Sequence, residues 1–275
     1  MTEAPTITLN NGAQIPQLGF GVFQVSPEDI VGAVRKALEV GYRHIDTAAA
    51  YQNEEGVGRA IADSGLARDE LFVTTKLWNT DQGHDEALEA FDASLARLGL
   101  DFVDLYLIHW PAPGRDDYVD TWKAFEKIYA DGRARSVGVS NFTASNLRRL
   151  AAETTVTPAV NQIELHPSFT QSELRAVHAD MGIATEAWSP LGQAADLESP
   201  TVTEIAERLG RTPAQVVLRW HLQLGNIAFP KSVTPARIEE NFDVFDFELA
   251  DDDMTAITAL DRDNRIGPDP DTFNG

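Results

Sequence analysis

FVDLYLI, at residues 102–108, is the stretch of sequence that most clearly indicates the fold. Its apolar side chains occupy both faces of an extended segment, which is typical of a strand in a parallel sheet covered on both sides. Polar and aromatic residues, His109 and Trp110, follow at its end. Seven further short runs predict strands over 19–22, 44–46, 71–74, 135–139, 159–162, 183–187 and 227–229.

Amphipathic helical patterns lie between these runs. Ser26-Pro27-Glu28-Asp29 predicts the start of one helix with Ser26 as its N-cap, and Gly41 predicts its end. Thr212-Pro213 and Thr234-Pro235 predict two further helix starts. Eight strands, each followed by a helix, predict an α/β fold of the (β/α)8 TIM-barrel type, with extra helices near strand 8.

A doubly wound sheet is the structural alternative, and it predicts a glycine-rich phosphate loop after the first strand. Gly56-Val57-Gly58 follows acidic residues rather than a strand. Gly19-Phe20-Gly21 lies in a predicted strand, but no third glycine or helix start follows it. The barrel is therefore favoured.

The residues ahead of the first strand predict an N-terminal β-hairpin. Segments 6–9 and 13–15 flank Asn10-Asn11-Gly12, and Asn-Gly favours a two-residue turn. We expect this hairpin to cover the amino-terminal mouth of the barrel. Because the chain shows no linker and no shift in composition, we expect residues 1–275 to form a single domain.

Composition excludes several classes of function. The chain has 22 basic and 43 acidic residues, a net charge of -21, which argues against nucleic acid or an anionic membrane as a partner. It has no cysteine and no H-E-x-x-H motif, so we expect neither a disulfide, a thiol nucleophile nor a metal site. No signal-peptide pattern and no apolar run of about 20 residues is found, so we expect a cytoplasmic protein. We also expect it to be a monomer.

Reactive side chains of a barrel enzyme lie at the carboxyl ends of its strands. Asp46, Lys76 and His109 end three neighbouring predicted strands, and Tyr51 lies in the loop after Asp46. Each alone has a structural explanation, as a helix cap, a packed aromatic or a buried histidine. Four such groups at adjacent strand ends indicate a site.

These four residue types suit one kind of chemistry. A cationic Lys76 would lower the pKa of Tyr51 from about 10, Asp46 would hold Lys76, and His109 would bind a substrate oxygen. Such a set donates a proton to an oxygen but contains no nucleophile. A hydride from a nicotinamide cofactor would complete the reduction of a carbonyl.

Seven motifs are spread along nearly the whole chain, and their combination is highly specific. They are GYRHIDTA (41–48), NEEGVG (53–58), TKLW (75–78), VDLYLIHWP (103–111), GVSNF (138–142), NQIELHP (161–167) and PKS (230–232). Together they resemble the aldo-keto reductase family. The resemblance is nearest to the bacterial 2,5-diketo-D-gluconate reductase subgroup, through residues 21–23, 188–192 and 241–247.

The resemblance implies roles for individual residues. The implied catalytic tetrad is Asp46, Tyr51, Lys76 and His109, with Tyr51 as the general acid in reduction and the base in oxidation. The nicotinamide of NADPH would stack on Trp188, where many relatives carry tyrosine. The other implied cofactor residues are Ser140, Asn141 and Gln162 at the carboxamide, Ser189, Leu191 and Gln193 along the pyrophosphate, Lys231, Ser232 and Arg237 at the 2′-phosphate, and Glu240 and Asn241 at the adenine. Phe23, Trp78 and Trp110 would line the substrate pocket.

We expect NADPH-dependent reduction of small aldehydes, α-dicarbonyls or keto sugars. A cofactor-binding sensor with little turnover is the alternative, and a metal-dependent hydrolase or lyase is a third possibility that lacks a ligand cluster. Residues 265–275 are rich in Pro, Asp and Gly and show no pattern. Because this tail is short, we expect an open pocket and broad substrate use.

Overall fold

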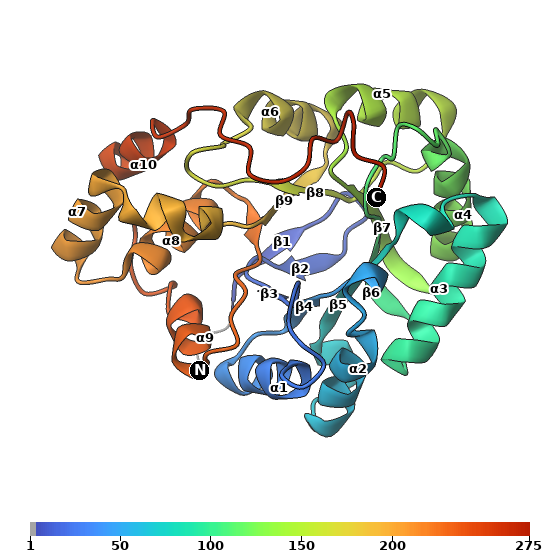
Figure 1. Ribbon diagram of the computed structural model, residues 1–275, viewed down its shortest axis with the longest axis horizontal. Helices are drawn as coiled ribbons and strands as arrows, with labels where there is room; N and C mark the ends of the chain where they lie inside the picture. The colour runs from blue at the N-terminus through green and yellow to red at the C-terminus, as the bar shows by residue number, and fades with distance from the viewer. Residues whose placement is uncertain (1–3) are drawn as a thin grey trace.

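The computed structural model describes residues 4–275, and its centre is a sheet of eight parallel strands (Figure 1). All eight predicted strands are present, although several bounds differ by one to three residues. They are β3 (Phe20–Gly21), β4 (His44–Asp46), β5 (Phe72–Leu77), β6 (Val103–Ile108), β7 (Ala134–Ser140), β8 (Val160–Glu164), β9 (Ala184–Trp188) and β10 (Ile227–Ala228). Each strand pairs with the next in chain order. A parallel bridge between Leu18 and Ala228 joins the first strand to the last, so the sheet closes into the predicted barrel.

Ten α-helices surround the barrel over the described part of the chain. They are α1 (Ile30–Val40), α2 (Glu54–Asp63), α3 (His84–Leu98), α4 (Tyr118–Ala130), α5 (Ala144–Glu153), α6 (Ser172–Met181), α7 (Pro200–Leu209), α8 (Pro213–Gln223), α9 (Pro235–Phe242) and α10 (Asp251–Thr258). Two helices, α7 and α8, follow β9, and two more, α9 and α10, follow β10. These are the extra helices expected near the last strand. Within residues 4–275, no helix is long and apolar enough to cross a membrane.

The N-terminal hairpin closes one end of the barrel. Strands β1 (Thr6–Thr8) and β2 (Gln14–Pro16) are antiparallel, and Figure 1 shows them lying across the centre of the ring. Ile15 is fully buried and packs in one cluster with Leu105 and Leu107 of the barrel interior. The opposite end, where the strands finish, is left open for a site.

The turn of this hairpin differs from the two-residue turn expected from Asn-Gly. Leu9 N donates to Ala13 O at 2.8 Å, and Gly12 N donates to Leu9 O at 2.9 Å. Three residues therefore form the loop, with Gly12 in the left-handed region at φ 88°. A three-residue loop that ends in a left-handed glycine is the next most common hairpin connection.

One of the three predicted helix starts is wrong. Helix α1 begins at Ile30 with Asp29 as its N-cap, not at Pro27 with Ser26 as its N-cap. The Ser26 hydroxyl instead accepts from Asp29 N at 3.2 Å in a turn ahead of the helix. The predicted end at Gly41 and the starts after Thr212 and Thr234 are as expected.

Candidate active site

A cavity of about 1650 Å³ opens at the carboxyl ends of the strands. Every residue predicted for the site lines it except Lys76, which is fully buried beneath it. Several residues at its wall have left-handed backbones without being glycine, among them Asn141 (φ 61°), Ser189 (φ 48°) and Gln193 (φ 51°). Strained backbone of this kind concentrates at functional sites, where the surrounding structure holds it in place.

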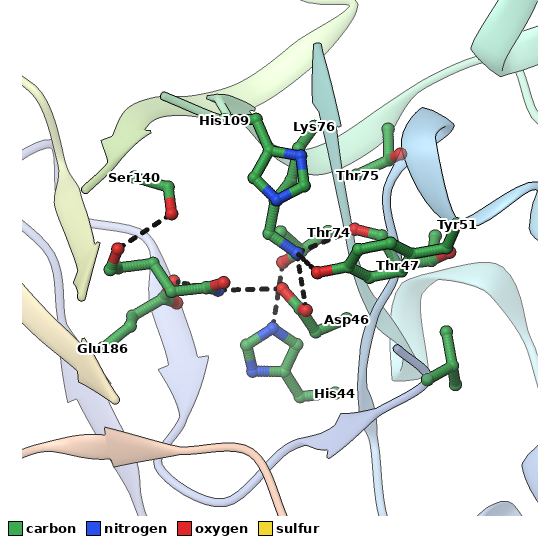
Figure 2. A network of polar contacts seen from close by, with 12 residues as sticks. His44, Asp46, Thr47, Tyr51, Thr74, Thr75, Lys76, His109, Ser140 and Glu186 are labelled. Carbon is green, nitrogen blue, oxygen red and sulfur yellow. Dashed lines mark hydrogen bonds and ion pairs between the residues drawn. The ribbon is translucent and has the colours of Figure 1, made fainter. Parts of the chain in front are cut away.

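Lys76 joins the ends of β4 and β5 beneath the cavity. Its Nζ lies 2.6 Å from Asp46 Oδ1 and donates to Thr47 O at 2.9 Å. The same nitrogen lies 3.4 Å from the hydroxyl oxygen of Tyr51. Figure 2 marks this contact with a dashed line. Burial is the largest single effect and lowers the pKa of Lys76, but the charges of Asp46 and Tyr51 and the hydrogen bonds to both together outweigh it and keep the pKa of Lys76 above its usual value. The ammonium group is therefore a fixed positive charge beside Tyr51.

The pKa of Tyr51 is raised, not lowered as expected from its position beside Lys76. Burial is the largest cause, and the negative charge of Asp46 adds to it. The charge of Lys76 acts in the expected direction, since it lowers this pKa, but it does not reverse the shift. At neutral pH the Tyr51 hydroxyl is thus protonated and can donate a proton.

His109 follows β6 and faces Tyr51 edge-on, with ring centroids 5.7 Å apart. Burial lowers the pKa of His109 well below its usual value, and the charge of Lys76 adds to the effect. The ring is neutral and holds one N–H. The backbone carbonyl of His109 accepts from Asn141 Nδ2 at 3.0 Å. This bond fixes the end of β6 to the loop after β7. His109 can therefore bind a neutral oxygen beside the Tyr51 hydroxyl.

Three polar residues and one indole form the middle of the cavity. Trp188 Nε1 donates to Asn141 Oδ1 at 2.8 Å, and Ser140 Oγ donates to the carbonyl of Gln162 at 2.8 Å. A Cβ at Gly267 would lie 2.4 Å from the edge of the Trp188 ring, so the backbone there holds the indole closely. The flat ring and the amide groups suit a planar ring that carries a carboxamide.

The far end of the cavity carries positive charge. Lys231 and Arg237 are exposed, and neither has a salt-bridge partner within residues 4–275. Ser232 Oγ accepts from Thr234 N at 3.0 Å at the start of α9. Glu240 accepts from the Thr212 hydroxyl at 2.8 Å, and Asn241 is buried beside it. Two unpaired cations on a chain with a net charge of -21 indicate an anion site.

Aromatic side chains form the walls near Tyr51. Phe23 lies 5.1 Å from Tyr51 between ring centroids, and Trp78 lies 5.2 Å from His109. The tail adds a wall that the sequence did not reveal, since Phe273 packs on Trp110 at 4.5 Å. The short tail therefore forms part of the pocket wall at this side. The Asn274 side chain, which accepts from Gly114 N at 2.6 Å, fastens the tail.

A buried cluster fastens two further segments of the cavity wall, and the sequence analysis missed it. His166 bonds to Glu164 Oε1 and to Asp196 Oδ2, both at 3.0 Å. Burial opposes protonation of His166, but the bonds to Asp196 and Glu164 outweigh it and raise its pKa. Glu164 also accepts from the backbone of Ile266 and Gly267 at 2.6 and 2.8 Å. The cluster thereby ties the loop after β9 and the tail to β8.

Known proteins resemble this chain along its whole length. The model of the Aldo/keto reductase family matches residues 17–262. An aldo-keto reductase of Mycolicibacterium smegmatis is 61% identical over 271 residues, 98% of each chain. Methylglyoxal reductase DkgA of Escherichia coli is 51% identical over 277 residues, 100% of each chain. The crystal structure of a Gox0644 mutant in complex with NADPH superposes with a TM-score of 0.95 at 48% identity, covering 99% of each chain.

Proposed function

The chain belongs to the aldo/keto reductase family, and on that premise we propose that it reduces small aldehydes, α-dicarbonyls or keto sugars with Tyr51 as the general acid. Like the family, the protein is an NADPH-dependent oxidoreductase. Its curated relatives in Escherichia coli and Salmonella typhimurium are named methylglyoxal reductases. Methylglyoxal is an α-dicarbonyl compound, so these relatives support that part of the proposed substrate range.

The cavity suits NADPH in three places. The flat face of Trp188 would hold the nicotinamide, and the amide of Gln162 with the Ser140–Asn141 pair would hold its carboxamide. Lys231 and Arg237, which have no ion-pair partner among the described residues, would bind the 2′-phosphate. The loop of Ser189, Leu191 and Gln193 lines the cavity between these ends, where the pyrophosphate would lie.

NADPH, when bound, supplies a hydride to the carbonyl carbon. The substrate oxygen would lie between the neutral ring of His109 and the hydroxyl of Tyr51. As negative charge develops on that oxygen, Tyr51 donates its proton to it, and the product is an alcohol. Lys76, 3.4 Å from the hydroxyl oxygen, stabilises the tyrosinate that remains. Asp46 holds Lys76 in place and keeps it charged.

The observation that carries this proposal is the position of the Tyr51 hydroxyl. It lies beside a buried ammonium group, at the aromatic end of a cavity whose other end holds two unpaired cations among the described residues. A proton donor and a dinucleotide-sized space thus share one cavity.

We also propose that the protein is a monomer and lies in the cytoplasm, as expected from the sequence. Size-exclusion chromatography with light scattering tests the monomeric state.

A panel of carbonyl compounds assayed by the loss of NADPH absorbance tests the proposed function. Reduction of small aldehydes or α-dicarbonyls supports it. If NADPH binds and quenches the fluorescence of Trp188 while no carbonyl in the panel is reduced, the chain is a cofactor-binding sensor. The same assay after exhaustive chelation tests the metal-dependent alternative, because loss of activity that zinc or manganese restores would favour it.

A further inference from the structure

Glu186 is a buried carboxyl group that the proposed mechanism does not use. It lies within β9, its residue is fully buried, and its side chain points to the barrel interior below the tetrad (Figure 2). Its Oε2 accepts from Gln162 Nε2 at 3.0 Å. Its Oε1 has no hydrogen-bond partner within residues 4–275. Burying an ionisable side chain inside a barrel costs free energy, which suggests that Glu186 has a function.

Gln162 stands between this carboxyl group and the tetrad. Its Nε2 donates to Asp46 Oδ2 at 2.9 Å as well as to Glu186. An amide nitrogen has two hydrogens, so these two carboxyl groups use both. The two carboxyl groups thereby hold Nε2 of Gln162 toward the barrel interior. The oxygen Oε1 is the only polar atom of this side chain that they leave without a hydrogen bond. Because Gln162 lines the cavity, Oε1 is left for a ligand there.

Both hydrogens of the neighbouring amide, that of Asn141, are already used. Asn141 Nδ2 donates to His109 O and to Ser140 Oγ, both at 3.0 Å, while its Oδ1 accepts from Trp188. A carboxamide NH₂ group that enters this part of the cavity therefore finds, in the oxygen of Gln162, an acceptor that has no hydrogen-bond partner within residues 4–275. The donors of a nicotinamide carboxamide would complete this arrangement.

The protonation state of Glu186 is consistent with its hydrogen bond to Gln162. Burial raises the pKa of Glu186 to about 8, and the negative charge of Asp46 adds to this, while Gln162 and then Lys76 oppose it. The neighbouring strand β10 consists of Ile227 and Ala228, so it places no titratable side chain beside Glu186. At neutral pH the carboxyl group is protonated, so Asp46 remains the single negative charge paired with Lys76.

We propose that Glu186 is a positioning residue for the nicotinamide: together with Asp46 it turns the nitrogen of Gln162 inward and presents the oxygen of Gln162 to the cofactor carboxamide. This inference rests on the proposed function, since it needs NADPH in the cavity. Glu186 itself does not touch the cofactor. It acts through Gln162, and it couples the nicotinamide site to the ion pair of the tetrad.

Two variants of similar side-chain volume separate positioning from packing. Glu186→Gln keeps an acceptor for Gln162 Nε2, whereas Glu186→Met fills the space without one. We expect Glu186→Met to weaken NADPH binding about 3- to 10-fold, as for the loss of one hydrogen bond, and Glu186→Gln to bind within about twofold of wild type. Adenosine 2′,5′-bisphosphate lacks the nicotinamide, so its affinity should be equal in all three proteins. Isothermal calorimetry measures each value without any turnover.

A cofactor analogue tests the same point without a variant that might fail to fold. The reduced 3-acetylpyridine analogue of NADPH replaces the carboxamide NH₂ by a methyl group. Wild type should bind it about 3- to 10-fold more weakly than NADPH. Equal affinity for the two cofactors in wild type would overturn the proposal. So would unchanged NADPH binding in a folded Glu186→Met protein, or an equal loss in Glu186→Gln.

The failure of the proposed function gives a different result from the failure of this inference. If wild type binds neither NADPH nor the bisphosphate, the proposed function fails, and the inference fails with it. If wild type binds NADPH tightly but the analogue and both variants behave alike, the inference alone fails.

Discussion

Lys76 Nζ and Asp46 Oδ1 lie 2.6 Å apart in an ion pair whose two side chains are almost fully buried below the cavity. Removing one partner of a buried pair leaves the other charge uncompensated, which costs about 3–5 kcal/mol. The intact pair itself adds little to stability, because burying both charges costs about as much as their attraction returns. What the pair does provide is a fixed positive charge next to Tyr51. That charge lowers the pKa of Tyr51 against the effect of burial.

Lys76→Met should slow alcohol oxidation and carbonyl reduction by a similar factor, because the equilibrium constant of the reaction fixes the ratio of the two rates at a given pH. Oxidation needs the Tyr51 tyrosinate as a base, and loss of the ammonium group raises the pKa of Tyr51 further. Each pKa unit of that rise lowers the tyrosinate fraction about tenfold at a fixed pH. Rates in both directions between pH 6 and 9 measure this, with the exposed Lys123→Met as the control. Wild-type rates in the variant would show that Lys76 does not tune Tyr51.

Arg237→Ala should weaken NADPH binding about 10- to 100-fold and leave NADH binding nearly unchanged, because a charge-assisted hydrogen bond contributes about 1.5–3 kcal/mol. The preference of wild type for NADPH should also shrink as salt rises, because the contact is ionic and exposed. Fluorescence titrations with both cofactors measure this, with the exposed Arg148→Ala as the control. If Arg237→Ala loses both cofactors equally, Arg237 supports the fold and does not bind the phosphate.

Glu186→Gln should change how stability depends on pH. In the folded protein burial raises the pKa of Glu186 from 4.5 to about 8. Between these values the unfolded chain has lost the proton that the folded protein keeps, so wild-type stability falls as pH rises, by up to about 1.4 kcal/mol per pH unit. The variant has no titrating group at this position. Urea unfolding should therefore show that its free energy of unfolding rises relative to that of wild type from pH 5 to pH 8. A constant difference would mean that Glu186 ionises normally in the folded state.

Phe273→Ala should raise the KM for aromatic aldehydes several-fold and leave the Kd of NADPH unchanged. The ring packs on Trp110, so its removal opens the wall near Tyr51 and away from Lys231 and Arg237. Steady-state kinetics with benzaldehyde and methylglyoxal measure this effect. Phe247→Ala, in which the ring removed lies against Arg211 and outside the cavity, is the control. An unchanged KM for both aldehydes would place the substrate away from the tail.

The strands and the position of the tetrad follow from the sequence for one physical reason. Parallel strands buried on both faces appear as apolar runs, and their carboxyl ends meet at one mouth of a barrel. The polar residues that end these runs, such as Asp46 and His109, therefore had to converge. The motif resemblance then supplied the proposed cofactor residues, all of which line the cavity.

Other features depend on tertiary contacts that have no local pattern. Phe273 lies in a tail without periodicity, and contacts with Trp110 and through Asn274 set its position. The sign of the Tyr51 pKa shift depends on how deeply the ring is buried, which neighbouring residue types do not reveal. Glu186 did leave a trace in the sequence, since it is the one carboxyl residue of β9, but its partner Gln162 lies on the neighbouring strand.

Single-turnover kinetics of Tyr51→Phe test the central claim most directly. This variant loses the hydroxyl beside Lys76 and keeps the ring that packs on Phe23. With the enzyme saturated with NADPH and mixed with methylglyoxal, hydride transfer should be about 10²–10⁴-fold slower than in wild type, the usual contribution of general acid catalysis. The Kd of NADPH should stay within about twofold of wild type, because the hydroxyl serves the proton transfer and not the cofactor. Hydride transfer at the wild-type rate would contradict the assignment of Tyr51 as the proton donor.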